Sequence, residues 1–552
     1  MTILTVDKKK LEKIVGKITP ELENKITEMG TPIEEVTDDE LSVEVFPNRP
    51  DLLSLENFAR AINQFMGKRG LVNFKVNKPE KDYIVTINKA VKEVRPFTAC
   101  AVIKGLKFSD ARIKSVIELQ EKLHGSYGRN RRKLALGIYP IEEIIFPLTY
   151  TAEKPNDIKF QPLEFPRVIT GRQILSQHPT GRDYGELLKG QELFPIYKDA
   201  AGEIMSMPPI INSHKTGRIT EKTKAVFIEC SGFNKEYLKK TIDLVVSSFS
   251  EMGGKIYAVE IKDNADGNFI TPDMAPEKMK FKIKDIEKTL GIELTEKNVK
   301  NYLSRMGIGY ENDKGKSVAI IPCYRTDILH WIDLAEEVAI AYGYENFVPE
   351  IPDISTIAYE DPMDVAKKTI GNVLAGLGLL ETSSFHLVTK KNVKKMHYDF
   401  NDFIELEDSK TERDVLRIDM LTNLLQIASE NSNAAYPQKT FEMGRIFSRS
   451  VNENSETGID EKERLAISLI DEKINFTELK QVLDYLFKML NIEYLIENVE
   501  NNNYIIGRCG KIIVDGKDIG FIGEVAPRVL KNWKIKLPMV ALEIGLDFLG
   551  TC

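Results

Sequence analysis

The sequence lacks the features that mark secreted and membrane-spanning proteins. Its 5 cysteines are few for 552 residues, odd in number and scattered, which argues against a disulfide framework and against a cysteine-rich metal site. The N-terminal segment contains the lysine run Lys8–Lys10 and no apolar core, so we expect no secretory signal. No apolar run approaches the length of a membrane span. These absences predict a reduced, cytoplasmic protein that does not enter a membrane.

Two common catalytic signatures are missing as well. The 6 histidines stand singly, without a His-x-x-x-His spacing, so neither a zinc hydrolase nor a Ser-His-Asp hydrolase is predicted. Gly376 and Gly378 lack the rest of a dinucleotide fingerprint and fall inside an amphipathic helical pattern, which favours close helix packing. The formal net charge of -7 is mild, so any contact with nucleic acid must use a local basic patch or a partner subunit.

What is present is an ordinary globular composition spread over several domains. The apolar fraction of 42% is typical of a soluble protein, and the chain is too long for a single core. A polar break at 77–82 and a proline-containing linker at 348–356 divide the chain. The pattern of helices and strands predicts an α+β multidomain protein. The predicted domains are residues 1–85, 91–272, 276–351 and 357–552.

A short segment of the third predicted domain is unusually acidic. On a helix that begins near Asp327, which would be its N-cap, the later acids share one face, and Leu329 and Ile340 bracket them. A face that only meets solvent has little reason to carry such aliphatic neighbours. The four acids are Asp327, Asp333, Glu336 and Glu337.

Two interpretations of this acidic face remain open from the residues alone. Acids near a helix N-terminus are stabilised by the helix dipole by roughly 0.3–1 kcal/mol each, which suits Asp327 and Asp333. Glu336 and Glu337 lie two turns into the helix and repel Asp333, and a hard cation such as Mg²⁺ or a cationic partner would relieve that repulsion.

A second group of polar residues predicts the wall of a pocket. The tandem prolines within Ser206–Ser213 hold that segment extended and remove two backbone donors. Glu229 and Ser231 are two residues apart on a strand, so they project from the same face. The alternative is a structural turn beside a half-exposed strand. The residues that could face one space are Ser206, Asn212, Arg218, Glu229 and Ser231.

One basic cluster interrupts the otherwise mixed charges of the second domain. Its pattern favours a solvated loop over a contact with RNA phosphates. The cluster consists of Arg129, Arg131, Arg132 and Lys133.

Several motifs in a fixed order resemble the β subunit of phenylalanyl-tRNA synthetase, of the archaeal and eukaryotic type. The resemblance extends over essentially the whole chain. It rests on the segments Phe46–Ser54, Arg95–Val102, His178–Tyr184, Ser206–Ser213, Tyr324–Glu337 and Phe441–Phe447.

The resemblance implies a role for each predicted domain. After the N-terminal α+β domain it implies a mixed α/β tRNA-editing module, a small winged-helix-like metal-bearing domain, and a C-terminal class II synthetase-like domain built on an antiparallel sheet. That last domain would be non-catalytic. Its segment Val540–Leu549 lacks the arginines that class II sites use against ATP phosphates, so phosphoryl charge would not be neutralised there.

The resemblance further implies partners and cofactors. The chain would join an α subunit in an α₂β₂ heterotetramer that attaches phenylalanine to tRNA(Phe) with ATP and Mg²⁺, and the aminoacylation site would lie in the α subunit. The acids Asp327, Asp333, Glu336 and Glu337 match those that the family assigns to magnesium near the α subunit.

The resemblance also implies an editing pocket that hydrolyses tyrosyl-tRNA charged in error. Such a second site is useful because a pocket for phenylalanine excludes tyrosine only weakly. Ser206, Asn212, Arg218, Glu229 and Ser231 match its positions, but the family has Asp at 229 and Thr at 231. The longer Glu229 could shrink the pocket or move the carboxylate.

Two other classes of protein compete with this interpretation. One is a free-standing nucleic-acid-binding protein that uses the small helical domain and the basic cluster at 129–133. The other is a free-standing hydrolase that edits tRNA without an α subunit. Assembly with a class II α subunit distinguishes both from a synthetase β subunit.

Overall fold

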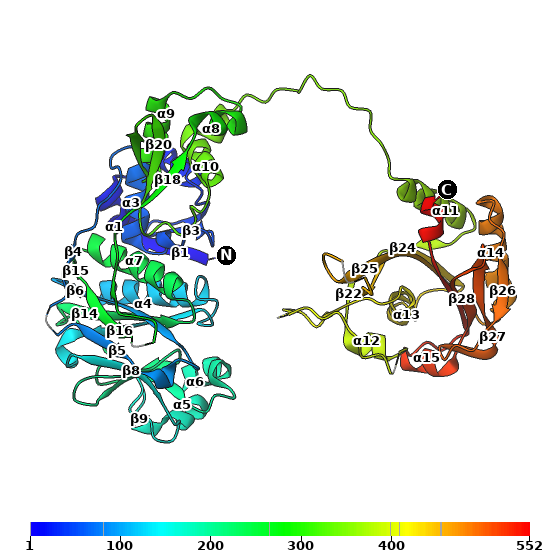
Figure 1. Cartoon of the computed structure of the whole chain (residues 1–552), viewed down its shortest axis with the longest axis horizontal. Helices are drawn as coiled ribbons and strands as arrows, with labels where there is room; N and C mark the ends of the chain where they lie inside the picture. The colour runs from blue at the N-terminus through cyan, green and yellow to red at the C-terminus, as the bar shows by residue number, and fades with distance from the viewer. Residues whose placement is uncertain are drawn as a thin grey trace. The chain divides into compact units, whose positions relative to one another are not determined.

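The computed structural model describes residues 2–80, 82–263, 265–397, 399–407, 409–452 and 455–551 (Figure 1). It divides into two compact units, of which the first ends at Ile351 and the second begins at Pro352. Several separate sheets with associated helices confirm the predicted α+β multidomain class. No helix in the described part of the chain is long and apolar enough to cross a bilayer.

The first unit begins with a small antiparallel sheet in the order β1–β3–β2, covered by helices. Asp7, Thr19 and Ser54 each cap the following helix by accepting a backbone N–H. The elements are β1 (Thr2–Asp7), α1 (Lys8–Val15), α2 (Pro20–Glu28), β2 (Ile33–Val36), β3 (Glu40–Val45), η1 (Pro50–Leu52) and α3 (Leu55–Phe65).

Two larger sheets follow and pack face to face. The first, in the order β4–β15–β6–β14–β7, consists of β4 (Val76–Asn77), β15 (Lys255–Tyr257), β6 (Phe97–Lys104), β14 (Ala225–Gly232) and β7 (Leu134–Pro140). The second, in the order β13–β12–β11–β8–β5–β16–β17, consists of β13 (Ile211–Asn212), β12 (Ile204–Met207), β11 (Phe194–Lys198), β8 (Leu148–Glu153), β5 (Ile84–Ile87), β16 (Val259–Asp263) and β17 (Phe269–Thr271). One apolar cluster, which includes Tyr150, Tyr197 and Phe227, fills the space between them.

Helices and short elements enclose these sheets. Helices α4 and α7 cover the face of β6, β14 and β7 that points away from the second sheet. The added elements are η2 (Lys89–Val91), α4 (Asp110–Gly125), η3 (Ile141–Glu143), β9 (Lys159–Phe160), β10 (Ile169–Thr170), α5 (Gly171–Gln177), α6 (Pro179–Tyr184), η4 (Gly185–Leu188) and α7 (Lys235–Glu251).

The last part of the first unit is a small region of helices and an antiparallel sheet in the order β18–β20–β19. Thr295 caps the helix α9 through a capping box with Asn298. The elements are β18 (Glu277–Phe281), α8 (Ile283–Leu290), α9 (Glu296–Arg305), β19 (Gly309–Asp313), β20 (Lys316–Ile321), α10 (Trp331–Tyr342) and η5 (Tyr344–Asn346).

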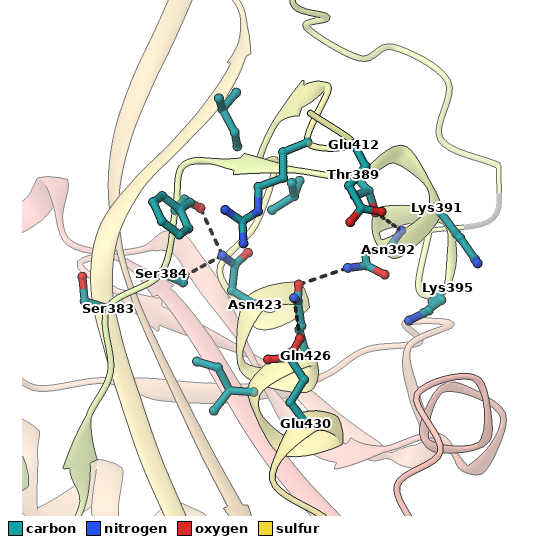
Figure 2. Close-up of a pocket in the computed structure, with 15 residues that line it drawn as sticks. Ser383, Ser384, Thr389, Lys391, Asn392, Lys395, Glu412, Asn423, Gln426 and Glu430 are labelled. Carbon is teal, nitrogen blue, oxygen red and sulfur yellow. Dashed lines mark hydrogen bonds between the residues drawn. The ribbon is translucent and has the colours of Figure 1, made fainter. Parts of the chain in front are cut away.

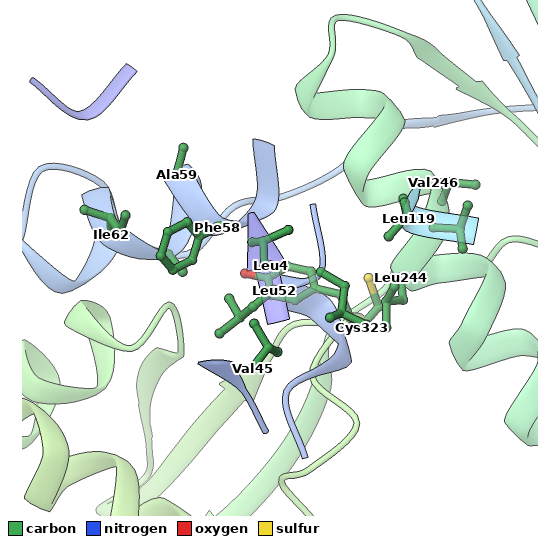
Figure 3. Close-up of a cluster of buried hydrophobic side chains, with 14 of the residues drawn as sticks. Leu4, Val45, Leu52, Phe58, Ala59, Ile62, Leu119, Leu244, Val246 and Cys323 are labelled. Atoms are coloured by element: carbon green, nitrogen blue, oxygen red, sulfur yellow. The ribbon is translucent and has the colours of Figure 1, made fainter. Parts of the chain in front are cut away.

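A single hydrophobic core joins the first three predicted domains. Figure 3 shows Leu52 and Phe58 of the N-terminal region, Leu119 and Leu244 of α4 and α7, and Cys323 of the small region, all members of one cluster of buried side chains. The boundary drawn at residue 85 also falls within β5, which belongs to a sheet of the next region. The polar break in the sequence therefore marks a surface connection rather than the edge of a separate core.

The second unit is built on a long sheet in the order β21–β24–β25–β29–β28–β27–β26, antiparallel except where β21 joins β24. Its strands are β21 (Leu380–Glu381), β24 (Gln438–Arg449), β25 (Ile459–Ile470), β26 (Leu495–Asn498), β27 (Tyr504–Val514), β28 (Lys517–Val525) and β29 (Met539–Gly545), with β22 (Leu387–Val388) and β23 (Val415–Leu416) paired separately. Its helices are α11 (Pro362–Gly376), α12 (Lys390–Lys394), α13 (Leu421–Glu430), α14 (Phe476–Met489), α15 (Pro527–Asn532) and η6 (Asp547–Thr551).

Both faces of this sheet are covered by helices. Along β29, Val540 and Leu542 pack with α11 and α14, whereas Met539 and Ala541 pack with α13 and α15. One detail differs from expectation: α11 ends at Gly376, and Gly378 follows it with a φ of 79°. This glycine pair therefore ends a helix, because a left-handed φ suits glycine, instead of lying inside one.

Candidate functional site

Glu229 lies on β14, at the edge of the core between the two larger sheets. Its side chain is 2% exposed, and the register places it opposite Gly137 of β7. The Tyr139 hydroxyl donates a hydrogen bond to its Oε1 at 3.2 Å. Burial raises the pKa of Glu229 to about 8, which favours the protonated carboxylic acid at neutral pH. Its Oε2 has no hydrogen-bond partner among the described residues.

The segment with the tandem prolines is a hairpin, so its central part is the structural turn of the alternative interpretation and not a continuously extended segment. Strands β12 and β13 are antiparallel, the chain reverses between them, and the Pro208–Pro209 peptide is cis. Proline restricts φ but is compatible with turns as well as extended chain, so the sequence did not decide between them. Ser206 and Asn212 are consequently cross-strand partners. Asn212 Oδ1 also lies 3.2 Å from the Tyr139 hydroxyl, whose one proton it shares with Glu229 Oε1.

Gly137 makes this arrangement possible. A Cβ atom at this position would collide with the Tyr139 hydroxyl and with Glu229 Oε1. Glycine therefore leaves the space in which Tyr139 bridges Asn212 and Glu229. Ser206 Oγ lies buried beside this group and, within the described residues, has no hydrogen-bond partner.

A cavity of about 870 Å³ opens next to these residues. Of the five predicted pocket residues, Asn212, Arg218 and Glu229 line it directly. Ser206 and Ser231 do not line it. Ser231 is a fully buried residue of β14, and Arg95 Nε donates to its Oγ at 3.2 Å. Strand alternation correctly put Ser231 on the same face as Glu229, but the packing of Arg95 closes that part of the face.

Arg131 differs from the predicted solvated loop of the basic cluster. It is 8% exposed and lines the cavity, so it does not lie in a solvated loop. Its Nη1 donates to the carbonyl oxygens of Pro209 and Ile210 at 3.1 and 2.8 Å, and its Nη2 pairs with Glu121 at 3.0 Å. These bonds fix the turn of the β12–β13 hairpin. Three consecutive positive φ angles at 129–131 bring the side chain inward.

His124 is a second cavity residue that no spacing in the sequence indicated. Its Nε2 accepts the backbone N–H of Leu136 at 2.8 Å, and its Nδ1 lies 3.3 Å from Glu121 Oε1. Burial lowers the pKa of His124, and an acceptor role for Nε2 requires the proton to be on Nδ1. The imidazole thus positions the β7 strand that carries Gly137.

The acidic motif has a different structure from the predicted one. Helix α10 begins at Trp331 with His330 as its N-cap, so Asp327 lies before the helix and does not cap it. Asp333 is the residue that completes the cap, because its Oδ2 accepts the backbone N–H groups of Leu329 and His330 at 2.7 Å each. Capping thus accounts for Asp333 without a metal.

Arg325 binds two of the four acids. Its Nε and Nη2 form a fork with Asp327 at 2.9 and 2.7 Å, and its Nη1 and Nη2 meet the two oxygens of Glu337 at 2.9 and 2.7 Å. The Arg325 side chain is 1% exposed. Arg49 and Asp51, two residues apart in the N-terminal motif, form a fork of the same kind at 2.9 Å. The two forks influence each other electrostatically, which places these distant motifs together.

Glu336 is the acid that remains exposed. Partial burial, followed by repulsion from Glu337 and Asp333, raises the pKa of its carboxyl. It lines a mainly apolar groove of about 360 Å³ between α8 and α10. Leu329 is 81% exposed, but Ile340 packs against the core. Of the two aliphatic residues predicted to flank the acids, only Leu329 therefore lies on the surface.

The four acids therefore do not fit a resident magnesium ion in this chain alone. Their carboxylate oxygens are of the kind that Mg²⁺ prefers, but two acids are neutralised by Arg325 and a third caps α10. Among the described residues, no three His, Cys, Asp or Glu side chains gather in a way that could hold a metal ion. Magnesium at this motif stays a prediction.

The segment Val540–Leu549 includes most of β29 and has a packing role in the second unit. Glu543 is half-buried at its centre and accepts the backbone N–H groups of Met420 and Leu421, each at 3.0 Å, at the start of α13. Burial raises the pKa of Glu543 to about 7. Helix α13 therefore occupies this face of the sheet, and the polar residue beneath it serves the helix terminus.

Matches to known families follow the division of the chain. Residues 349–546 match the phenylalanyl tRNA synthetase beta chain CLM domain, and residues 279–344 match the tRNA synthetase B5 domain. These two matches define the chain as a component of an aminoacyl-tRNA synthetase.

Whole-length relatives specify the family. The phenylalanine–tRNA ligase beta subunit of Pyrococcus abyssi is 37% identical over 502 residues, which cover 90% of this chain and 89% of the relative. That of Archaeoglobus fulgidus is 34% identical over 99% of this chain and 98% of the relative. A crystal structure of an N-terminal fragment of the Pyrococcus horikoshii beta subunit has a TM-score of 0.59 and 33% identity, covering 62% of this chain and 99% of the fragment. The chain belongs to the phenylalanine–tRNA ligase beta subunit family, which confirms the resemblance of its motifs.

The raised pKa of Glu229 predicts a pH-dependent cost to stability. Between 4.5 and about 8 the folded chain keeps a proton that the unfolded chain loses, so the stability contributed by Glu229 is complete below 4.5 and falls as the pH rises to 8. The slope is at most about 1.4 kcal/mol per pH unit. Glu229→Gln has no carboxyl group that titrates, so its stability relative to the wild type should increase from pH 5 to pH 8.

Chemical denaturation midpoints at several pH values measure this difference. Glu236→Gln, at a side chain that is 76% exposed, controls for removal of a carboxyl group. A difference between Glu229→Gln and the wild type that stays constant with pH would contradict the protonated state of Glu229.

Proposed function

We propose that this chain, together with an α subunit, attaches phenylalanine to its tRNA with ATP, and that the aminoacylation site lies in the α subunit. The observation that carries the proposal is identity of 34–37% to beta subunits of phenylalanine–tRNA ligase over most of both chains. The covered sheet of the second unit supports the assignment of the synthetic site to the partner. An adenylate needs an open face with cationic groups, and α13 fills the face beside Glu543.

The partners follow from this proposal. The chain acts in an α₂β₂ tetramer in the cytoplasm, and ATP with its Mg²⁺ is consumed at the α subunit. No step of the reaction is assigned to a metal at the acidic motif of this chain, because its acids do not fit an ion here. If the assembled enzyme holds magnesium at this motif, Asp333 and Glu336 are the acids that do not pair with Arg325.

We further propose that the cavity of the first unit hydrolyses tyrosyl-tRNA charged in error. Glu229 Oε2, on a residue that lines it, is buried and has no partner among the described residues, whereas the equally unpartnered Ser206 Oγ belongs to a residue outside the lining. A phenol hydroxyl can bond to Glu229 Oε2 and to the Asn212 amide that lines the same cavity, whereas a phenyl ring leaves the Glu229 oxygen unpaired. Leaving buried polar groups unpaired costs about 1–3 kcal/mol each, so the site discriminates against phenylalanine.

Each polar group then has a defined task. Glu229, neutral at pH 7, can donate or accept, and Tyr139 holds its Oε1 so that Oε2 is the oxygen left for a ligand. Asn212 is oriented by the same hydroxyl. Arg131 and His124 act at a distance, since they fix the hairpin and the β7 strand that carry the contacting residues.

Water is the nucleophile that this cavity allows. The described residues that line it include no cysteine and no serine paired with a histidine base, so an enzyme-bound ester is not expected. Arg218 lies at the lining and can neutralise charge that develops on the ester oxygen or pair with a tRNA phosphate. Hydrolysis then depends on positioning of water and the substrate's own hydroxyl groups.

Charging of tRNA should require both subunits. The chain expressed alone is expected to bind neither ATP nor phenylalanine productively and to give no phenylalanyl-tRNA, whereas the chain purified with a class II α subunit should give it. Acid-gel analysis of charged tRNA measures both. Charging by the chain alone, or failure to form a complex with an α subunit, would contradict the proposal.

Editing should be separable from charging by substitutions at the cavity. In the assembled enzyme, Tyr139→Phe and Glu229→Ala should each slow hydrolysis of tyrosyl-tRNA by about tenfold or more and leave phenylalanylation unchanged, because each removes a polar contact or its orientation. Arg218→Ala and Arg132→Ala form a matched pair, in which only Arg218 lines the cavity. Unchanged hydrolysis of tyrosyl-tRNA in Tyr139→Phe and Glu229→Ala would rule out this pocket.

A further inference from the structure

The second unit contains a cavity that the proposed function does not use. It has a volume of about 520 Å³ and lies between α12, α13 and the short β22–β23 pair (Figure 2). Charged, amide, aromatic and aliphatic side chains all contribute to its walls. The cavity lies wholly within the second unit and is separate from the cavity at Glu229.

One wall presents a buried acceptor without a partner. Asn423 on α13 is 5% exposed, and its Nδ2 donates to Ser384 Oγ at 2.5 Å and to the Phe385 carbonyl at 3.2 Å. Its Oδ1 is buried and, within the described residues, accepts no hydrogen bond. Figure 2 shows the amide at the cavity wall with its nitrogen turned toward Ser384. A ligand that brings an N–H group to this wall would satisfy Oδ1.

The orientation of this amide is fixed from behind. Ser384 Oγ, which accepts from Asn423, donates to Glu442 at 2.6 Å, and Glu442 in turn pairs with Arg417 at 2.9 Å. Arg417 and Glu442 are both 2% exposed at their side chains. Because this network is buried, Asn423 cannot turn its oxygen away without losing two hydrogen bonds. The acceptor is therefore preorganised.

A chain of hydrogen-bonded polar side chains runs from α12 to α13 along the cavity. Asn392 Nδ2 on α12 donates to Gln426 Oε1 at 3.0 Å, and Gln426 Nε2 donates to Glu430 at 2.8 Å. This orders Gln426 and leaves the Asn392 carbonyl oxygen as a further acceptor. The dashed lines in Figure 2 follow this chain along α13.

A flat cationic surface stands at the rim. Phe385 is 66% exposed, and the guanidinium carbon of Arg413 lies 4.2 Å from the centre of its ring. A guanidinium stacked on an aromatic ring presents a second planar face on which an unpaired base can stack.

Lysines extend from the cavity along the surface. Lys391 and Lys395 line it and form no ion pair with any described residue. Burial lowers the pKa of Lys395, and repulsion from Lys391 and Lys534 lowers it further. The three ammonium groups are therefore close enough to interact electrostatically. Lys395 also lies 3.8 Å from the ring centre of Trp533. A basic track thus continues from the cavity toward α15, beyond the reach of a single small anion.

We propose that this cavity binds an unpaired nucleotide within a single-stranded segment of RNA. The base would stack on Arg413 and offer an N–H edge to Asn423, while the phosphates on either side meet Lys391 and the track through Lys395. Two acids, Glu412 and Glu430, also line the cavity, so cationic side chains exceed them by only one. Binding therefore depends on stacking and the amide as well as on charge.

The test uses the full chain in complex with its α subunit. Fluorescence anisotropy measures the affinity for labelled single-stranded hexaribonucleotides of A, C, G and U and for tRNA, and equilibrium dialysis measures AMP and CMP. The variants are Arg413→Ala and Lys391→Ala, both at exposed side chains. Lys394→Ala on the same helix α12 is the matched control, because it removes the same charge outside the cavity.

Each cavity variant should weaken the affinity for at least one hexaribonucleotide by about tenfold, whereas the affinities of Lys394→Ala should stay within twofold of the wild type. Lys391→Ala should also reduce the salt dependence of binding. A parallel loss with tRNA would make tRNA the natural source of the strand. If the variants lose affinity for AMP or CMP but keep the wild-type affinity for the hexaribonucleotides, the proposal of an RNA strand would be overturned in favour of a free nucleotide. Wild-type affinities in both variants, or displacement of RNA by an acidic hexapeptide at equal concentration, would overturn the proposal entirely.

Discussion

The guanidinium of Arg325 is the buried charge around which the first unit is organised. Asp327 and Glu337 bind it from two sides, and removal of either would leave a buried cation without adequate compensation, typically at a cost of about 3–5 kcal/mol. The pair fixes the segment before α10 to the helix itself. The adjacent Tyr324 then lies under Arg60 of α3, with the guanidinium carbon 3.9 Å from its ring centre. Arg305 of α9 adds a hydrogen bond to the Phe65 carbonyl at 2.9 Å. The small region and the N-terminal region are thereby held as one body.

The same interaction explains why spacing alone could not interpret the acidic motif. Four acids in thirteen residues suggest a metal or a helix dipole, yet the structure divides them among an ion pair, a helix cap and one exposed carboxylate. The decisive residue, Arg325, stands in the same sequence segment. A guanidinium two residues before an acid can turn to solvent or fold back as a fork, and only the tertiary burial of this segment selects the fork. Arg49 and Asp51 repeat the arrangement in the N-terminal motif.

Local patterns predicted local structure well, and failed where distant segments meet. Strand alternation placed Glu229 and Ser231 on one face. The hairpin at Pro208–Pro209, the inward turn of Arg131 and the closure of the face by Arg95 all depend on contacts between segments far apart in the sequence. The predicted limit at residue 85 had the same weakness, because a polar surface connection does not reveal whether the cores on its two sides are continuous. Family motifs supplied what periodicity could not, namely the order and identity of the regions.

Hydrogen exchange of the assembled protein, followed by mass spectrometry, tests most directly whether Arg325 holds the first unit together. Glu337→Ala should raise exchange in residues 2–65 and 276–342 together, since the ion pair and the shared core connect them. Glu336→Ala, at the neighbouring exposed acid, should leave both segments protected. Faster exchange confined to 276–342 in Glu337→Ala, or equal effects of the two substitutions, would contradict this account.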